Sequence, residues 1–133
     1  MTLKFTILGC GSSMGVPTAT NNWGNCNPNE KKNIRTRCSA LITSKNSNTL
    51  IDTSPDLRLQ LLNNKIQNIK RVIYTHMHAD QTHGINDLRA FFLKNNKRID
   101  IYADTLTSKY LKKTFKYCFN GSKQYPAIAK INI

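Results

Sequence analysis

The three histidines of the chain lie within eight residues of one another and are the first candidates for chemistry. His76 and His78 are two positions apart just after an apolar segment that predicts a β-strand, so extended backbone would point both imidazoles the same way. Asp80 follows two residues later. Two imidazoles near a carboxylate are typical ligands of zinc, manganese or iron ions. Since histidine is absent elsewhere, we favour a metal site over three solvated polar residues on a strand-to-helix loop.

Residues 75–80, with the sequence THMHAD, resemble the start of the metallo-β-lactamase superfamily signature, His-x-His-x-Asp-His. Other segments narrow the resemblance to the branch that contains the phosphoribosyl 1,2-cyclic phosphate phosphodiesterases. These segments are residues 9–17 (GCGSSMGVP), 35–39 (RTRCS), 50–58 (LIDTSPDLR) and 84–89 (GINDLR). Because the segments occur in matching order along the chain, the chain is similar to this superfamily over its first two thirds.

The resemblance implies a fold, a cofactor and a set of roles. The fold would be α/β, a four-layer αββα sandwich that holds one or two divalent metals, zinc or manganese, at the edge of its sheets. Metal-activated water would attack a phosphodiester. His76 and His78 would bind the first metal, and Asp80 would bind the second as one catalytic carboxylate. Asp52 would be the other catalytic carboxylate and would orient one of the metal ligands without binding the metal itself. An equal alternative is that Asp52 is a turn carboxylate that caps a helix or loop.

The chain departs from the signature at its next histidine, which is Gln81 here. An amide is a weaker ligand than imidazole, so we expect an impaired second metal site, with Gln81 beside it. His83 is a candidate replacement ligand if a helical turn begins at Asp80, and the alternative is a surface histidine at a helix entry. Asp87 and Arg89 match the family's helix and are predicted to support the site or contact substrate, unless they form a structural salt bridge.

The length of the chain sets a further expectation. It has 133 residues, about half of what the resemblance implies, and no histidine follows His83. We therefore expect residues 1–133 to form one metallo-β-lactamase-like domain that is incomplete at its C-terminus, corresponding to the N-terminal half. The last strand would then present an exposed sheet edge, which favours a homodimer. The loop around Cys26 holds one cysteine, so we expect no structural zinc there.

Composition limits the possible partners. The net charge is +13, from 20 Lys and Arg against 7 Asp and Glu, so nucleic acid is a possible partner beside a small phosphodiester. The alternative is a general compositional bias, in which the lysines form a solubilising surface. No apolar run reaches the ~18 residues of a membrane helix, and we expect no membrane association. The apolar stretch within residues 4–10 is shorter than a secretory core, so we expect a cytoplasmic protein. The four scattered cysteines are then expected to be buried, reduced thiols.

Periodicity places these motifs on an alternating set of elements. A strand is predicted at residues 3–8, followed by a small-residue loop and a long irregular loop at residues 17–32. Apolar runs at residues 38–43 and 49–51 predict a hairpin. Ser54 and Pro55 predict the start of a helix, with Leu57, Leu61 and Leu62 on its buried face. The remaining predictions are a strand at residues 71–74, a helix from about Ile85, a strand at residues 99–102, a helix at residues 105–117 and a terminal strand after Tyr125.

Three functions are compatible with these observations. The leading hypothesis is a metal-dependent hydrolase that acts on a phosphodiester, with the activity of a chain this short left open. The second is a tRNA-processing nuclease similar to ribonuclease Z, which would use the basic surface. The third is an inactive remnant, or a module that binds metal or phosphate. Lactam hydrolysis has no support in the residues themselves, because a fold does not determine a substrate.

Overall fold

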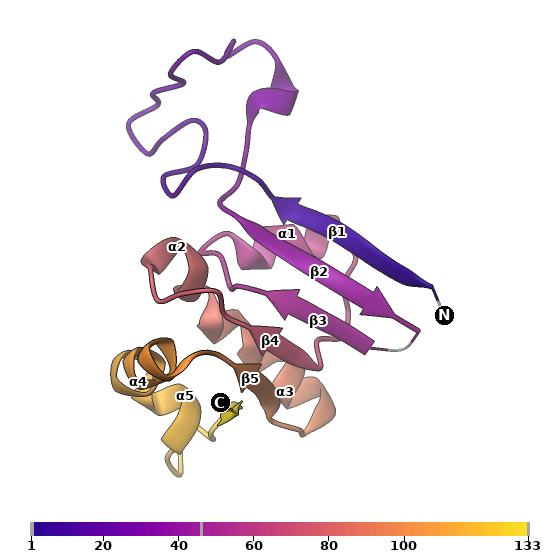
Figure 1. Cartoon of the computed structure of the whole chain (residues 1–133), viewed down its shortest axis with the longest axis vertical. Helices are drawn as coiled ribbons and strands as arrows, with labels where there is room; N and C mark the ends of the chain where they lie inside the picture. Colours follow the sequence, from indigo (N-terminus) through magenta and orange to yellow (C-terminus); the bar gives the residue numbers. More distant parts are fainter. Residues whose placement is uncertain (1, 46, 133) are drawn as a thin grey trace.

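A single mixed sheet organises the molecule in a computed structural model that describes residues 2–45 and 47–132. Its strands follow the chain order from one edge to the other (Figure 1). The first three are antiparallel, and the last four run parallel to one another. The strands are β1 (Leu3–Gly9), β2 (Ser39–Ser44), β3 (Ser47–Ile51), β4 (Arg71–Ile73), β5 (Ile99–Tyr102) and β6 (Ala129–Asn132).

Short helices connect the parallel strands, as parallel pairing requires a crossover. In Figure 1, α1 and α3 lie behind the sheet, and the long loop after β1 projects beyond its edge. No helix among the described residues is long and apolar enough to cross a membrane. The α-helices are α1 (Leu57–Asn63), α2 (Ala79–Thr82), α3 (Arg89–Asn95), α4 (Thr105–Thr114) and α5 (Lys116–Asn120), and the 3₁₀ turns are η1 (Lys31–Asn33) and η2 (Ile85–Leu88).

The core lies on the helix-covered face of the sheet. Strand pairing places Leu41, Leu50, Val72 and Ile101 in one row across β2 to β5, and each is at most 1% exposed. Helical side chains close over this row, among them the fully buried Leu111. Burial of such a row supplies the main driving force for forming the sheet.

The opposite face of the sheet is uncovered within residues 2–45 and 47–132. A second row runs across it, where Ile7 pairs with Ala40, Ala40 with Ile51, Ile51 with Ile73, and Ile73 with Tyr102. Ile7 is 65% exposed, and Ile73 and Tyr102 are each 40% exposed. The expected α/β class is confirmed, and the described residues contribute one helical layer and one sheet of the four-layer arrangement.

The first helix starts later than predicted, and it buries Leu57 and Leu61 as predicted but not Leu62. It begins at Leu57, because Ser54 accepts from the backbone N–H of Asp56 in a turn that precedes the helix. Leu62 is 59% exposed, whereas Gln60 is 2% exposed and donates to the Arg37 carbonyl oxygen. Gln60 can be buried because its side-chain amide hydrogen-bonds to a backbone carbonyl group in the loop before β2.

The two later helical predictions are each divided in the structure. The segment expected to form one helix from Ile85 is a 3₁₀ turn followed by α3, and α2 precedes both. The helix expected over residues 105–117 breaks at Phe115, whose φ of −112° and ψ of 41° leave the helical region while its ring stays buried. The predicted terminal strand is confirmed as β6, which pairs parallel with β5.

The prediction that the cysteines are buried is confirmed for Cys118 and wrong for Cys10 and Cys38. Both exposed cysteines lie at the ends of the long loop, Cys10 directly after β1 and Cys38 directly before β2.

Candidate functional site

The two neighbouring histidines lie at the end of β4, on the sheet edge where parallel strands β3, β4 and β5 terminate. Their ring centroids are 4.7 Å apart with the ring planes at 77°, and both residues are exposed. Ligand sites of open α/β sheets commonly lie outside this edge, at the carboxyl ends of the strands. The structure therefore brings His76 and His78 together as the sequence predicted, with their rings accessible from solvent.

A hydrogen-bond chain orients the first of these rings. The Thr75 hydroxyl donates to Asp52 Oδ2 at 2.7 Å and lies 3.0 Å from His76 Nδ1. Because the single hydroxyl proton is used toward Asp52, the Thr75 oxygen must accept from His76 Nδ1–H. That assignment leaves Nε2 of the neutral ring with its lone pair free. A hydroxyl that fixes the tautomer in this way prepares Nε2 for an electrophile such as a metal ion.

Asp52 is held in place by both backbone and side-chain contacts. It follows β3 with a left-handed φ of 59°, is 6% exposed, and also accepts from the backbone N–H of Thr75 at 2.8 Å. Burial raises the pKa of Asp52, while the Thr75 hydrogen bonds and the nearby His76 oppose that rise. Non-glycine residues in this conformation are uncommon and are enriched near functional sites. The structure thus places Asp52 behind Thr75, where it accepts from the backbone of the loop after β4 and contacts the hydroxyl that faces His76, so its position is compatible with both predicted alternatives.

Asp80 and Gln81 form a local pair at the start of α2. The Gln81 amide donates to Asp80 Oδ2 at 2.9 Å, and Gln81 is itself 7% exposed. Its other amide atom, Oε1, is buried without a hydrogen-bond partner among the described residues. The glutamine that replaces the signature histidine therefore orients the neighbouring carboxylate, and it retains an unused acceptor.

The third histidine is occupied elsewhere. The ring of His83 packs edge-on against Phe115 with centroids 5.4 Å apart, and its Nδ1 lies 3.1 Å from the Thr82 hydroxyl. The Thr82 hydroxyl donates to the His78 carbonyl oxygen at 2.9 Å, which ties the end of α2 to the histidine segment. The contacts of His83 link α2 to the break between α4 and α5.

The donor set fits a divalent metal only in part. The free Nε2 of His76 and the adjacent imidazole of His78 are suitable nitrogen donors. Over residues 2–45 and 47–132, however, no group of three or more His, Cys, Asp or Glu side chains is placed to hold one metal ion. Asp80 is tied to Gln81, and His83 to Phe115. The described chain thus offers two adjacent imidazoles and lacks a three-residue ligand group.

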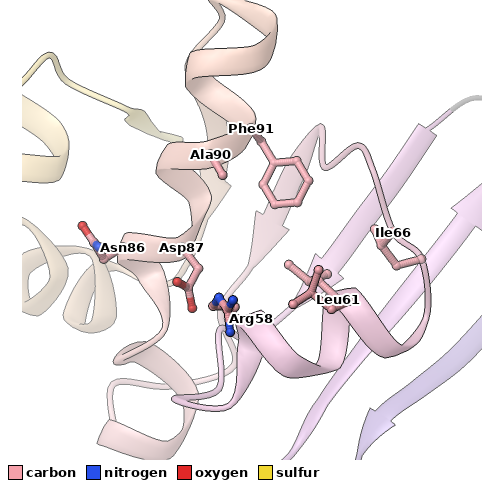
Figure 2. A pocket seen from close by; sticks show the side chains of 8 residues that line it. Arg58, Leu61, Ile66, Asn86, Asp87, Ala90 and Phe91 are labelled. Atoms are coloured by element: carbon pink, nitrogen blue, oxygen red, sulfur yellow. The ribbon is translucent and has the colours of Figure 1, made fainter.

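The side chains of Asp87 and Arg89 contact different parts of the molecule. Asp87 lines a pocket of about 370 Å³ between α1 and α3, where its carboxylate lies beside Arg58 (Figure 2). Burial raises the pKa of Asp87, and the N–H and charge of Arg58 oppose the shift. The guanidinium of Arg89 lies 4.4 Å from the ring centroid of Tyr125. Asp87 thus lies beside Arg58 and Arg89 packs against Tyr125, and neither residue forms a salt bridge within the described part of the chain.

Sequence reasoning missed two features that position the site. The role of Thr75 was not predicted, although its position directly before His76 is a signal that the sequence contains. Arg37 and Asp56 form a bidentate pair, with guanidinium contacts at 2.6 and 2.8 Å, and the backbone N–H of Arg37 donates to the same carboxylate. This pair ties the long loop to α1, and nothing in local spacing indicated it.

Comparison with known proteins places these features in a family. A model described as "Beta-lactamase superfamily domain" matches residues 47–133. The histidine motif, the end of β3 and the parallel half of the sheet lie within the matched segment. The match therefore includes the elements that position Asp52, His76 and His78.

Two similar proteins share about a third of their aligned residues with this chain. A crystal structure of "a New Diphosphatase from the PhnP Family" superposes with a TM-score of 0.83 and 32% identity, covering 98% of this chain and 50% of that one. An octanoyltransferase from Porphyromonas gingivalis is 32% identical over 125 residues, which are 93% of this chain and 25% of that protein. The chain thus spans half the length of the diphosphatase and a quarter of the length of the octanoyltransferase.

A more distant structure shares the fold alone. The short form of human tRNase Z superposes with a TM-score of 0.62 at 19% identity, covering 86% of this chain and 40% of that one. Similarity at this level shows that the two chains share the same arrangement of sheet and helices. It does not indicate a shared substrate, because one fold can serve many functions.

Proposed function

The chain belongs to the β-lactamase superfamily, and from that premise we propose that it supplies the histidine pair of a metal-dependent hydrolase that cleaves a phosphodiester. The observation that carries this proposal is the arrangement of His76 and His78 at the strand-end edge, with Asp52 and Thr75 orienting the first ring. Zinc and manganese are the proposed metals, since both accept imidazole nitrogen.

The chain's own residues have separable roles in this proposal. His76 and His78 would hold the first metal, and Asp80 would hold the second. When bound, such a metal polarises a phosphoryl oxygen and lowers the pKa of water. Asp52 acts through the Thr75 hydroxyl on the tautomer of His76, so that the neutral ring presents the Nε2 lone pair to the metal. Gln81 holds the Asp80 carboxylate in one orientation.

The substrate class is proposed from the aligned diphosphatase of the PhnP family. Both a diphosphate and a phosphodiester present bridging oxygen between phosphorus and a leaving group, so one strand-end site would suit either. Acyl transfer is not part of the proposal, since this chain covers only 25% of the octanoyltransferase.

Completion of the site is proposed to come from a second copy of the chain. The described residues lack a third donor at the histidine pair, and the apolar row from Ile7 to Tyr102 lies on the uncovered face beneath the same edge. A homodimer that covers this row, or joins exposed sheet edges, would exclude water beside the site and bring additional donors near it.

The test measures metal content and turnover together. After dialysis against zinc or manganese, we expect close to one metal per site by mass spectrometry, and hydrolysis of bis-p-nitrophenyl phosphate. His76→Ala should abolish both. His83→Ala distinguishes the two interpretations of that residue, because only a ligand would lose metal as His76 does. Wild-type protein that keeps less than about a tenth of an equivalent of metal would contradict the proposal and favour the inactive remnant.

A tRNA-processing nuclease is the second candidate. It is favoured by the net charge of +13, since phosphate contacts release counterions and make RNA binding strongly salt-dependent. Cleavage of a tRNA precursor by the metal-loaded protein, with no turnover of the small ester, would support this candidate over the first.

A further inference from the structure

Two hollows adjoin at the end of the sheet opposite the histidines. One of about 230 Å³ lies where the chain enters β4 and β5, and the other, of about 430 Å³, lies between β6 and helices α4 and α5. Arg98, directly before β5, lines both. Lys70 and His76 are six positions apart across β4, which corresponds to roughly 20 Å of extended chain. This surface is therefore distinct from the proposed metal edge.

Positive side chains line both hollows. Six of the 14 residues that line them are Lys or Arg, against 20 of 133 in the whole chain, and none is Asp or Glu. All six are exposed. We call these residues the basic belt: Lys70, Lys97, Arg98, Lys112, Lys116 and Lys130.

The charge of the belt is compensated at one point. Lys130 pairs with Asp100 at 2.9 Å, and this pair is the one ion pair formed by belt residues within the described part of the chain. The other five cations therefore leave a local excess of positive charge. Like charges gathered on one surface repel one another, and a polyanion relieves that repulsion while releasing its own counterions.

The remaining lining residues suit a nucleic-acid strand better than an acidic protein. Asn68, Asn95 and Asn120 offer amide donors and acceptors between the cations. Phe119 is half-buried at the wall of the larger hollow. Cations that follow a backbone, combined with an aromatic wall on which a base can stack, are the features of single-strand binding surfaces.

We propose that the basic belt binds the sugar–phosphate backbone of a single-stranded nucleic acid. Successive phosphates contact the lysines of the two hollows, and Arg98 bridges them. The proposal is independent of the metal edge and of any turnover there.

The test is fluorescence anisotropy with a fluorescein-labelled oligouridylate, in EDTA and on a His76→Ala background, so that failure of the proposed hydrolase leaves the result unaffected. Lys112→Gln combined with Lys116→Gln should weaken binding roughly tenfold, and should lower the slope of log K against log salt by about 1.4. The matched control is Lys31→Gln with Lys32→Gln, which removes the same charge from exposed turn η1. We expect the control to weaken binding less than about twofold.

Three outcomes would overturn the proposal. The first is wild-type protein with no salt-dependent binding. The second is an equal loss in both double variants, which would assign the affinity to net charge alone. The third is displacement of the oligouridylate by poly-glutamate as effectively as by unlabelled RNA, which would point to an acidic protein. Thermal unfolding by circular dichroism checks that all variants stay folded.

Discussion

Thr75 is the residue on which the orientation of the candidate site depends most directly. Its hydroxyl carries one proton and two lone pairs, and it joins the Asp52 carboxylate to the His76 ring. A carboxylate acting through a hydroxyl selects the Nδ1–H tautomer without contacting the imidazole itself. Outer contacts of this kind typically change metal affinity 10–100-fold when they are removed.

Thr75→Val removes the hydroxyl and keeps the shape of the side chain. We expect zinc affinity to fall about 10–100-fold, because His76 then samples both tautomers and several ring orientations. Isothermal titration calorimetry measures the change. Thr49→Val, the same substitution within β3 and away from the histidines, is the control. An unchanged affinity in Thr75→Val would show that His76 needs no such support.

The pair of Arg37 and Asp56 gives the stability of the protein a pH dependence. The Arg37 hydrogen bond lowers the pKa of Asp56, so the pair stabilises the folded state above the unfolded-state value of about 3.9. As pH falls through the lower folded-state pKa, this contribution is lost.

Asp56→Asn should cost about 1–3 kcal/mol of unfolding free energy near neutral pH. The difference from wild type should narrow as pH falls below about 4, because protonation of Asp56 removes the same interaction from the wild-type protein. Urea unfolding over a pH series measures both quantities. A difference that stays constant with pH would contradict the assignment.

At the scale of elements, the histidine segment is held between the ends of β3 and α2. The buried Thr53 hydroxyl lies 2.7 Å from the Tyr74 hydroxyl and 3.1 Å from the Thr82 carbonyl oxygen. Gly84 passes so close to the Ser54 carbonyl oxygen that an added Cβ would collide with it. These contacts fix where the chain leaves β4, and therefore where His76 and His78 project.

Tyr74→Phe tests this connection. Loss of one buried hydrogen bond should destabilise the protein by about 1 kcal/mol, measured by urea unfolding. Tyr102→Phe is the matched control, because that side chain is 40% exposed and its hydroxyl has no hydrogen bond among the described residues. Equal effects from the two substitutions would show that the Thr53 contact contributes nothing.

At the scale of the whole molecule, the sheet is apolar on both faces and only one is covered within the described chain. The exposed row continues to the edge strand β1, where Leu3, Phe5 and Ile7 are each more than 60% exposed. Contiguous apolar surface of this kind marks an association site, and the proposed homodimer would bury it.

Light scattering tests the homodimer directly. We expect wild-type protein to have twice the monomer mass of 15.1 kDa, and Phe5→Lys to shift it to the monomer, because a charge cannot be buried without a partner. Leu93→Lys places the same charge on an exposed position of α3 and should leave the mass unchanged. A wild-type monomer at all concentrations would exclude the homodimer.

Local spacing was enough to predict the position of the histidine pair and the order of most elements. The separation of His76 and His78 at the end of an apolar strand fixes their common direction, because side chains alternate along extended backbone. The α/β class followed from strands alternating with helical patterns. The helix boundaries could not be obtained in this way, because the breaks near Gly84 and Phe115 depend on contacts with distant backbone and on burial of a ring.

Only the tertiary structure decided how distant residues meet. Asp52 reaches Thr75 across 23 positions because β3 and β4 pair in parallel and end together, and no local pattern encodes that register. His83 is drawn to Phe115 from another element. The uncovered row and the basic belt likewise arise from strand order. Residue types and local spacing determine which chemistry is available, whereas pairing and packing between remote segments determine which groups can act together.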